Sequence, residues 1–108
     1  MAARALEESD FADGCPIGTV ACEVASSHDE IRKASAAVFA SWRARVAAQL
    51  VGEGVAAQRA RQLAMFAVAA LEGAILLARN DRDVAPLRDT GAVVAEVLRT
   101  ATRSARVA

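Results

Sequence analysis

Hydrophobic residues recur at helical spacing along most of this chain. From residue 31 to 50, and again from residue 87 to 101, apolar side chains return at the three- and four-residue intervals of one helix face. No stretch alternates between apolar and polar residues, so no β-strand is indicated. The pattern predicts an all-α fold, built as an antiparallel helical domain. The two stripes contain Ile31, Ser35, Val38, Trp42, Val46 and Leu50, then Leu87, Gly91, Val94, Leu98 and Ala101.

Local signals place the first helical segments. Residues Ala2–Glu8 have the composition of the last turns of a helix, and the loop Ser9–Cys15 follows. Pro16 suits the first position of a helix, because the N–H that proline lacks would have no partner there. Cys15 is therefore the predicted N-cap of a helix that runs to about Ala25.

The next helix has the clearest start signal of the chain. The sequence SHDE at positions 27–30 fits a capping box, in which Ser27 is the N-cap and Glu30 reaches back to it. Glycine commonly terminates helices, because it adopts a left-handed backbone without steric cost. This helix is therefore predicted to run to about Val51 and to end at Gly52.

Two further helices complete the predicted fold. Ala56–Arg79 is apolar almost all round, with Asn80 as its left-handed cap, and such a helix must be covered on most sides. Asp83 is the predicted N-cap of the last helix, Val84–Ala101. Since the linker between these two helices is short, they are expected to be antiparallel neighbours.

Composition argues against a membrane protein. The most apolar run, Leu63–Ala78, is shorter than the roughly 20 residues of a membrane span and contains Glu72, so we interpret it as a buried helix. The N-terminal sequence MAARALEESDF carries acidic residues where a signal peptide has an apolar core. We therefore expect a cytoplasmic protein without a membrane partner, in which thiols stay reduced.

The charge pattern offers no basic surface for nucleic acid. The chain carries 13 basic and 13 acidic residues, and the basic ones are spread out. The nearest approach to a cluster is Arg99, Arg103 and Arg106, which we interpret as a solvated, fraying C-terminal end. A DNA-binding surface usually shows a clustered basic face, so none is predicted.

Cys15, Cys22 and the only histidine, His28, are too few for a structural zinc site, which needs four ligands. Seven residues separate the cysteines, so two turns of one helix hold them roughly 10 Å apart, beyond the ~7 Å that a disulfide allows. Most simply, both are small buried hydrophobic residues. A reactive thiol at Cys15 remains an alternative, because a helix N-terminus favours the thiolate. His28 is interpreted as a surface residue of the capping turn.

Glu72 and Gly73 stand out within the most apolar helix. A buried carboxylate is costly unless it is paired or protonated. Glu72 is therefore expected to bond a partner helix, line a ligand pocket, or meet its own counterpart across a symmetric interface, unless it is simply exposed. Glycine costs roughly 1 kcal/mol inside a helix, and close approach of another helix is the usual reason for it. Small residues at four-residue spacing, Ala69 with Gly73 and Ala70 with Ala74, support such a contact.

No catalytic signature is present in the sequence. There is no phosphate-binding glycine loop, and no pair of carboxylates shares one helix face. The protein is therefore not expected to be an enzyme, and neither a cofactor nor a metal is predicted.

Four motifs together resemble a known family. They are Gly14-Cys15-Pro16-Ile17 opening a helix, the Phe39/Trp42 helix, LEGAILLAR at 71–79, and Ala85-Pro86-Leu87 opening the last helix. In this order the motifs resemble the C-terminal half of TetR-family transcriptional regulators, nearest to the LmrA/YxaF-like branch. The resemblance covers about Ser9 to Arg99.

The resemblance implies an effector-binding and dimerisation domain of a repressor, extending over residues 1–108 with its core at 9–101. In that family the last two helices of each subunit form a four-helix bundle with the partner's pair, which gives a homodimer. The implied interface residues are Leu71, Gly73, Ile75, Val94 and Leu98. A small hydrophobic effector is expected among the preceding helices, and the implied ligand-binding residues are Cys22, Phe39, Trp42, Met65, Phe66 and Glu72.

The chain departs from the family at its N-terminal side. Such regulators read operator DNA through a helix-turn-helix unit. The sequence has no room for that unit before Ser9, so this chain alone is expected not to bind operator DNA. Two other functions remain open: a helical homodimerisation module without a ligand, and a thiol-based sensor.

Overall fold

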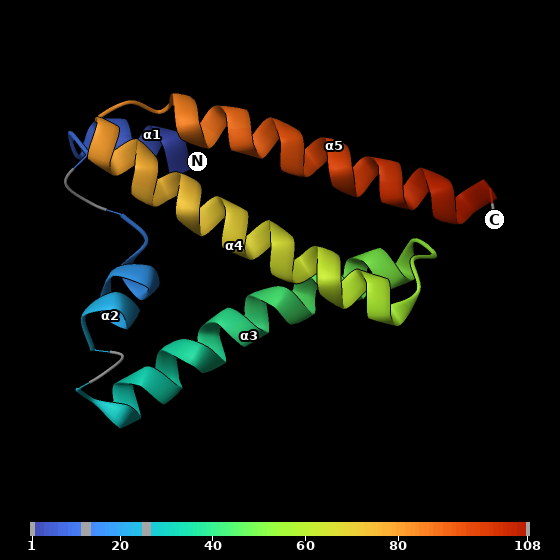
Figure 1. Ribbon diagram of the computed structural model, residues 1–108, viewed down its shortest axis with the longest axis horizontal. Coiled ribbons are helices and arrows are strands. Elements are labelled where there is room, and N and C mark those ends of the chain that lie inside the picture. Colours follow the sequence, from blue (N-terminus) through green and yellow to red (C-terminus); the bar gives the residue numbers. More distant parts are fainter. Residues whose placement is uncertain (1, 12–13, 25–26, 108) are drawn as a thin grey trace.

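The computed structural model describes residues 2–11, 14–24 and 27–107, and within them it contains five α-helices and no strand (Figure 1). This confirms the all-α prediction. In chain order the helices are α1 (Ala2–Glu8), α2 (Pro16–Val24), α3 (Asp29–Gly52), α4 (Ala57–Asp81) and α5 (Ala85–Val107).

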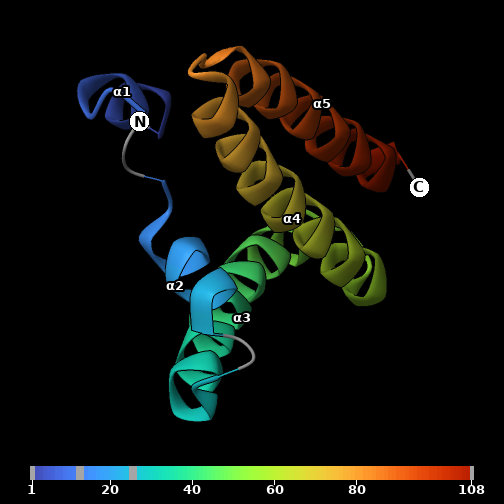
Figure 2. The same ribbon diagram turned by 60° about the vertical axis from the view of Figure 1, so that its left-hand side comes forward.

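The helix α4 is the centre of the arrangement. It packs against α5 as an antiparallel neighbour, as the short linker predicts, and it crosses α3 on another side. Helix α2 packs mainly on α3, and α1 lies near the turn between α4 and α5 (Figure 2). The molecule is flat, with extents of 44 × 33 × 17 Å, so much of each helix stays near the surface.

Two clusters of buried residues hold the helices together. One joins α1, α4 and α5 through Leu6, Ala74, Ala78, Val84 and Leu87. The other joins the α3–α4 connection to α5. Its buried members are Leu50, Val55, Ala60 and Leu63, and Ala105 of α5 packs against them. Alanine at the contact positions lets the helix axes approach closely, because it adds little bulk between them.

The start of α2 agrees with the prediction. The backbone N–H of Thr19 donates to the carbonyl of Cys15 at 2.9 Å, and the N–H of Gly18 donates to the Cys15 Sγ at 3.4 Å. Cys15 is thus the N-cap, and its sulfur satisfies one of the free N–H groups of the first turn. The predicted end of this helix, at Ala25, lies outside the described residues.

The capping box predicted at the start of α3 is wrong. The helix begins at Asp29, and its N-cap is His28, which has an extended backbone and makes no side-chain capping hydrogen bond. The carboxylate of Glu30 lies 3.8 Å from the Lys33 ammonium, so it extends along the helix and not back toward Ser27. Both acidic residues still lie in the first turn, where the helix dipole favours them.

The end of α3 depends on a different glycine from the one predicted. Gly52 is the last helical residue, and Gly54 adopts the left-handed backbone, with a φ of 102°. The N–H of Gly54 donates to the carbonyl of Val51, and the N–H of Val55 donates to that of Leu50, each at 3.0 Å. Both bonds belong to a Schellman motif, which is completed by the apolar contact of Val55 with Leu50.

The end of α4 also lies beyond the predicted cap. The helix continues through Asn80 to Asp81, and Arg82 adopts the left-handed conformation. Two tertiary contacts hold Arg82 there: its guanidinium is 2.7 Å from the Asp10 carboxylate and 5.8 Å from the centre of the Phe11 ring. The N–H groups of Arg82 and Asp83 also both donate to the carbonyl of Ala78. These backbone bonds, together with the side-chain contacts, offset a conformation that is unfavourable for a residue with a Cβ.

The last helix starts one residue later than predicted and also ends later. The carboxylate of Asp83 accepts a hydrogen bond from the N–H of Ala85 at 2.9 Å, so it satisfies a free N–H of the first turn. The carbonyl of Val84 accepts the first helical bond, from Arg88 at 3.0 Å, so the N-cap is Val84 and not Asp83.

The helix then continues past Ala101 to Val107. Arg99, Arg103 and Arg106 are exposed, as predicted for a solvated end. The end is not frayed, however, because Thr102 is buried and Ala105 packs on the second buried cluster.

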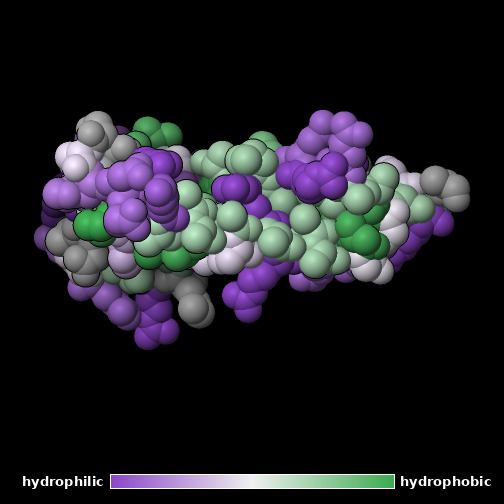
Figure 3. All heavy atoms as spheres, turned by 90° about the horizontal axis from the view of Figure 1, so that it is seen from below, coloured by the Kyte–Doolittle hydropathy of each residue, from purple (hydrophilic) through white to green (hydrophobic). Residues whose placement is uncertain are grey.

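By length and composition alone, α4 meets the criteria for a membrane-spanning helix, which core helices of water-soluble proteins also meet. The sequence predicts a buried helix, yet only 28% of its most apolar window is buried within the chain. Seen from below, apolar surface extends along the molecule between clusters of hydrophilic residues (Figure 3). The chain by itself therefore leaves a large part of the apolar surface of α4 uncovered.

Candidate functional site

A cavity of about 410 Å³ lies between α2 and α4. It is half open to solvent, and most of its surface is apolar. Side chains that carry chemistry and apolar side chains share its walls, as in ligand pockets generally. The residues that matter below are Cys15, Gly18 and Cys22 from α2 and its N-cap, and Glu72, Ile75 and Leu76 from α4.

Two glycines let charged side chains of α4 reach the start of α2. A Cβ on Gly18 would lie 2.6 Å from Oε2 of Glu72, closer than two such atoms can approach. A Cβ on Gly14 would lie 3.1 Å from Cδ of Arg79. The glycines thus make room for a carboxylate at one place and an arginine side chain at another.

The thiol of Cys15 is held in its neutral form. Burial raises its pKa above the ordinary thiol value, the backbone N–H of Gly18 lowers that pKa, and the carboxylate of Glu72 raises it again. The net direction is upward. The expectation that the helix N-terminus favours a thiolate is therefore wrong for Cys15, because burial and a neighbouring negative charge outweigh the first-turn N–H groups.

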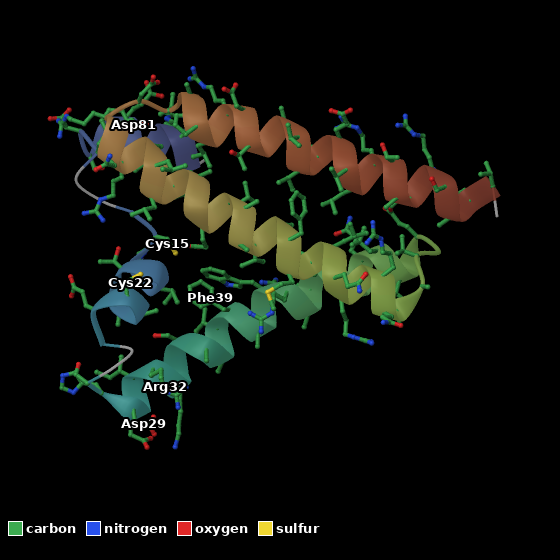
Figure 4. The ribbon with its side chains drawn as sticks, viewed as in Figure 1. Cys15, Cys22, Asp29, Arg32, Phe39 and Asp81 are labelled. Carbon is green, nitrogen blue, oxygen red and sulfur yellow. The ribbon has the colours of Figure 1, made fainter. Side chains whose placement is uncertain are left out.

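The structure brings only two of the predicted ligand residues into this cavity. Cys22 and Glu72 both line it. Figure 4 shows the Cys15 thiol near α4 and Phe39 pointing from α3 toward α2 and α4. The rings of Phe39 and Trp42 pack edge to face, with centroids 5.3 Å apart, and both residues are half-buried. Their assignment as ligand-binding residues remains a prediction.

Met65 and Phe66 are placed differently. They are 51% and 40% exposed, and Phe66 lines a separate groove of about 300 Å³ between α4 and α5, where it faces Val93. A larger groove of about 700 Å³ also includes Val93 and continues to where the two helices diverge. Two grooves that share Val93 thus lie between α4 and α5.

The residues predicted for a dimer interface divide into two groups. Leu71 and Ile75 pack on the first buried cluster, Leu98 packs on the second, and Val94 is only 5% exposed. These four hold the single chain together. Gly73 is exposed, and a Cβ placed on it would meet no described atom within 4 Å. The close approach that this glycine predicts is therefore not made inside the chain.

Sequence reasoning missed Gly14, Gly18 and Arg79 as parts of the site. The signal for Gly18 was available, because a glycine inside a helix costs stability and needs a reason. In this structure the reason is the carboxylate of Glu72. Nothing in the sequence pattern pairs Gly14 with Arg79. Among the described residues, no group of histidine, cysteine and acidic side chains is arranged to hold a metal ion.

Comparison with known proteins places these features in context. Residues 1–93 match the family described as transcriptional regulator LmrA/YxaF-like, C-terminal domain. The chain is 42% identical over 87 residues to the uncharacterized HTH-type transcriptional regulator Rv0196 of Mycobacterium tuberculosis, covering 76% of this chain and 45% of that protein. It is 32% identical over 85 residues to the uncharacterized HTH-type regulator YxaF of Bacillus subtilis, covering 79% and 44%.

The chain therefore spans about half the length of the curated relatives it matches. No solved structure matches it significantly.

Proposed function

Because the chain belongs to the LmrA/YxaF-like C-terminal domains of TetR-family transcriptional regulators, we propose that it is the ligand-sensing and dimerisation domain of a repressor. The family consists of regulators and not of enzymes, in line with the expectation from the sequence. A transcriptional regulator works inside the cell, which agrees with the expected cytoplasmic location. In this proposal residues 1–108 act as one domain.

One observation carries the proposal: α4 forms both a wall of the cavity and part of the exposed apolar surface. Its side toward α2 forms a wall of the cavity, through Glu72, Ile75 and Leu76. Another side exposes Phe66 and Leu77, which are 40% and 54% accessible. A ligand that shifts α4 therefore also shifts the exposed apolar surface.

A second copy of the chain is the proposed occupant of that apolar surface. Positions 66, 70, 73 and 77 recur at helical spacing and hence lie on one face of α4. They present Phe66 and Leu77 with small residues between them, and Val93 of α5 adds a side chain that is 53% exposed. An isologous two-fold contact buries such a face in both subunits at the same time. Relative to the sequence prediction, Gly73 stays in the interface, and Phe66, Leu77 and Val93 supply its exposed apolar area.

The cavity between α2 and α4 is the proposed effector site. Its volume of about 410 Å³ falls within the range of small-molecule sites, and its walls are mainly apolar. Cys22 and Glu72 contact the ligand directly in this proposal. Phe39 and Trp42 on α3, and Met65 nearer the start of α4, are the further proposed wall residues. Phe66 belongs to the dimer surface instead.

The proposed mechanism is a shift between two states of the dimer. An effector with higher affinity for one state favours that state by its difference in binding free energy. In this proposal a helix-turn-helix unit outside the described residues binds the operator. The dimer carries two such units, one from each subunit. Effector binding changes the spacing of that pair and releases the operator.

Light scattering coupled to size-exclusion chromatography tests the dimer, and thermal shift with a library of small apolar molecules tests the effector site. We expect a dimer at micromolar concentration and a higher melting temperature with some of the compounds. A monomer overturns the dimerisation part of the proposal. A dimer whose melting temperature no compound raises leaves a homodimerisation module without a ligand.

A further inference from the structure

The carboxylate of Glu72 has a fixed position in the cavity wall. It interrupts the most apolar part of α4, and its Oε2 atom occupies the space beside the backbone of α2 where a Cβ on residue 18 would lie. The contact exists only because residue 18 is glycine. The carboxylate is thereby held at the cavity, which both Glu72 and Gly18 line.

This carboxylate has unused capacity to accept hydrogen bonds. An ionised carboxyl group offers about four acceptor sites. Within the part of the chain that the structure describes, the donor next to Glu72 is the thiol of Cys15, and a thiol is a weak donor. The six ion pairs among the described residues do not include Glu72. A stronger donor can therefore bind there without displacing an existing ion pair.

The charge around the cavity also favours a positive ligand. Glu72 and Glu23 both line it, and the arginine among the lining residues, Arg79, lies against Gly14. A cation near Glu72 gains Coulomb energy in a partly desolvated site, whereas an anion is repelled. Ile75 and Leu76 make the wall near Glu72 apolar, and the Leu76 side chain is 64% exposed.

Taking the cavity as the effector site of the proposed function, we propose that its ligand is an organic cation, an apolar body with one protonated amine that pairs with Glu72. The amine donates to the carboxylate, and the apolar body covers Ile75 and Leu76. Gly18 is a positioning residue for this recognition, because its lack of a side chain leaves room for the carboxylate at the cavity.

Three probes that share a phenylbutyl group differ in the charge of their polar end. They are phenylbutylamine, phenylbutanol and phenylbutyrate, and they separate the contribution of the charge to binding from that of the apolar group. Their affinities for the full chain are measured by calorimetry. We expect the amine to bind roughly tenfold tighter than the alcohol, the size of one charge-assisted hydrogen bond, and the carboxylate to bind weakest. An alcohol that binds as tightly as the amine overturns the inference and leaves the effector site of the proposed function intact. If none of the three binds and the apolar library also fails, both are overturned.

Two variants test the residue that carries the preference. Glu72→Gln keeps the shape and removes the charge, so the amine should lose its tenfold advantage while the alcohol still binds. Glu96→Gln on α5, which lines the separate α4–α5 groove, is the matched control and should leave the order of the probes unchanged. Unfolding curves show that both variants are folded. An amine preference that survives Glu72→Gln overturns the inference.

Discussion

The Oε2 atom of Glu72 lies 2.6 Å from the point where a Cβ on Gly18 would be. The carboxylate on α4 therefore packs against α2 at a residue that has no side chain. Gly18→Ala must displace the carboxylate, which is the far end of a flexible side chain and moves at little cost. Alanine also raises helix propensity by up to about 1 kcal/mol. We therefore expect a folded variant, with a free energy of unfolding within about 1 kcal/mol of the parent, that has lost the contact of Glu72 with Cys15.

Denaturant unfolding and the labelling rate of Cys15 together check this prediction. When the carboxylate moves away, the pKa of Cys15 falls and the thiol reacts faster with a maleimide. Gly91→Ala on α5 is the control, because its Cβ would meet no described atom within 4 Å. That variant should leave the Cys15 rate unchanged. An unchanged rate in Gly18→Ala as well would contradict the contact.

The two cysteines are expected to differ in reactivity. Cys22 is exposed, whereas Cys15 is half-buried and its pKa is raised by burial and by Glu72. At neutral pH the thiolate is the reacting form, so mass tagging should modify Cys22 first and Cys15 several-fold more slowly. Faster labelling of Cys15 would restore the thiol-sensor alternative.

The same raised pKa predicts a pH dependence of stability. The folded state holds the Cys15 proton more tightly than the unfolded state does. Its contribution to stability is therefore complete below the ordinary thiol pKa and is lost as the pH rises through it toward the folded-state value. Cys15→Ser removes this titration, so the fall in melting temperature at alkaline pH should be shallower in the variant. Equal slopes in both proteins would show that the thiol does not contribute.

Local signals predicted some helix ends and missed others. The capping box before α3 is wrong although it is a local pattern, and Gly54, which ends α3 through a bond to Val51, was not predicted. Cys15 before Pro16 is a cap that a short stretch of sequence determines, and Asp83 bonds the N–H of Ala85 at the start of α5, one residue before the N-cap.

The end of α4, which also involves distant contacts, was missed. Arg82 has a left-handed backbone, which hydrogen bonds to the Ala78 carbonyl support, and its side chain contacts Asp10 and Phe11, which lie far away along the chain.

The candidate site shows the same limit. The spacing of residues places Glu72 on an apolar helix and marks it as unusual, but it does not say which helix meets it. Glu72 contacts α2 at Gly18, and this pairing depends on how α2 and α4 lie side by side in the fold. Phe66 was missed as a surface residue for a related reason. A helix that is apolar all round does not reveal which of its sides the chain itself covers.

Replacing Gly52 or Gly54 by alanine tests how α3 ends, because the two changes in the free energy of unfolding are expected to have opposite signs. Gly52 is helical and exposed, and a Cβ there would meet no described atom within 4 Å, so Gly52→Ala should stabilise by up to about 1 kcal/mol. Gly54 has a φ of 102°, which residues with a Cβ avoid, so Gly54→Ala should destabilise by roughly 1–2 kcal/mol. Urea unfolding of the two variants measures both. If Gly52→Ala destabilises the protein as much as Gly54→Ala does, the left-handed residue that ends α3 would be Gly52 and not Gly54.

The groove that Phe66 lines between α4 and α5 predicts how the dimer can be broken. Phe66 is 40% exposed and Ile31, on α3, is 43% exposed, so the two positions tolerate a charge equally well within one chain. If a second copy covers Phe66, Phe66→Glu loses about 2 kcal/mol of apolar burial per subunit and leaves a carboxylate in the interface, at a further cost of several kcal/mol. The dimer dissociation constant should then rise by roughly a hundredfold or more, and Phe66→Glu should elute as a folded monomer. Ile31→Glu should remain a dimer, as light scattering on both variants will show. A dimeric Phe66→Glu would move the interface away from this face of α4.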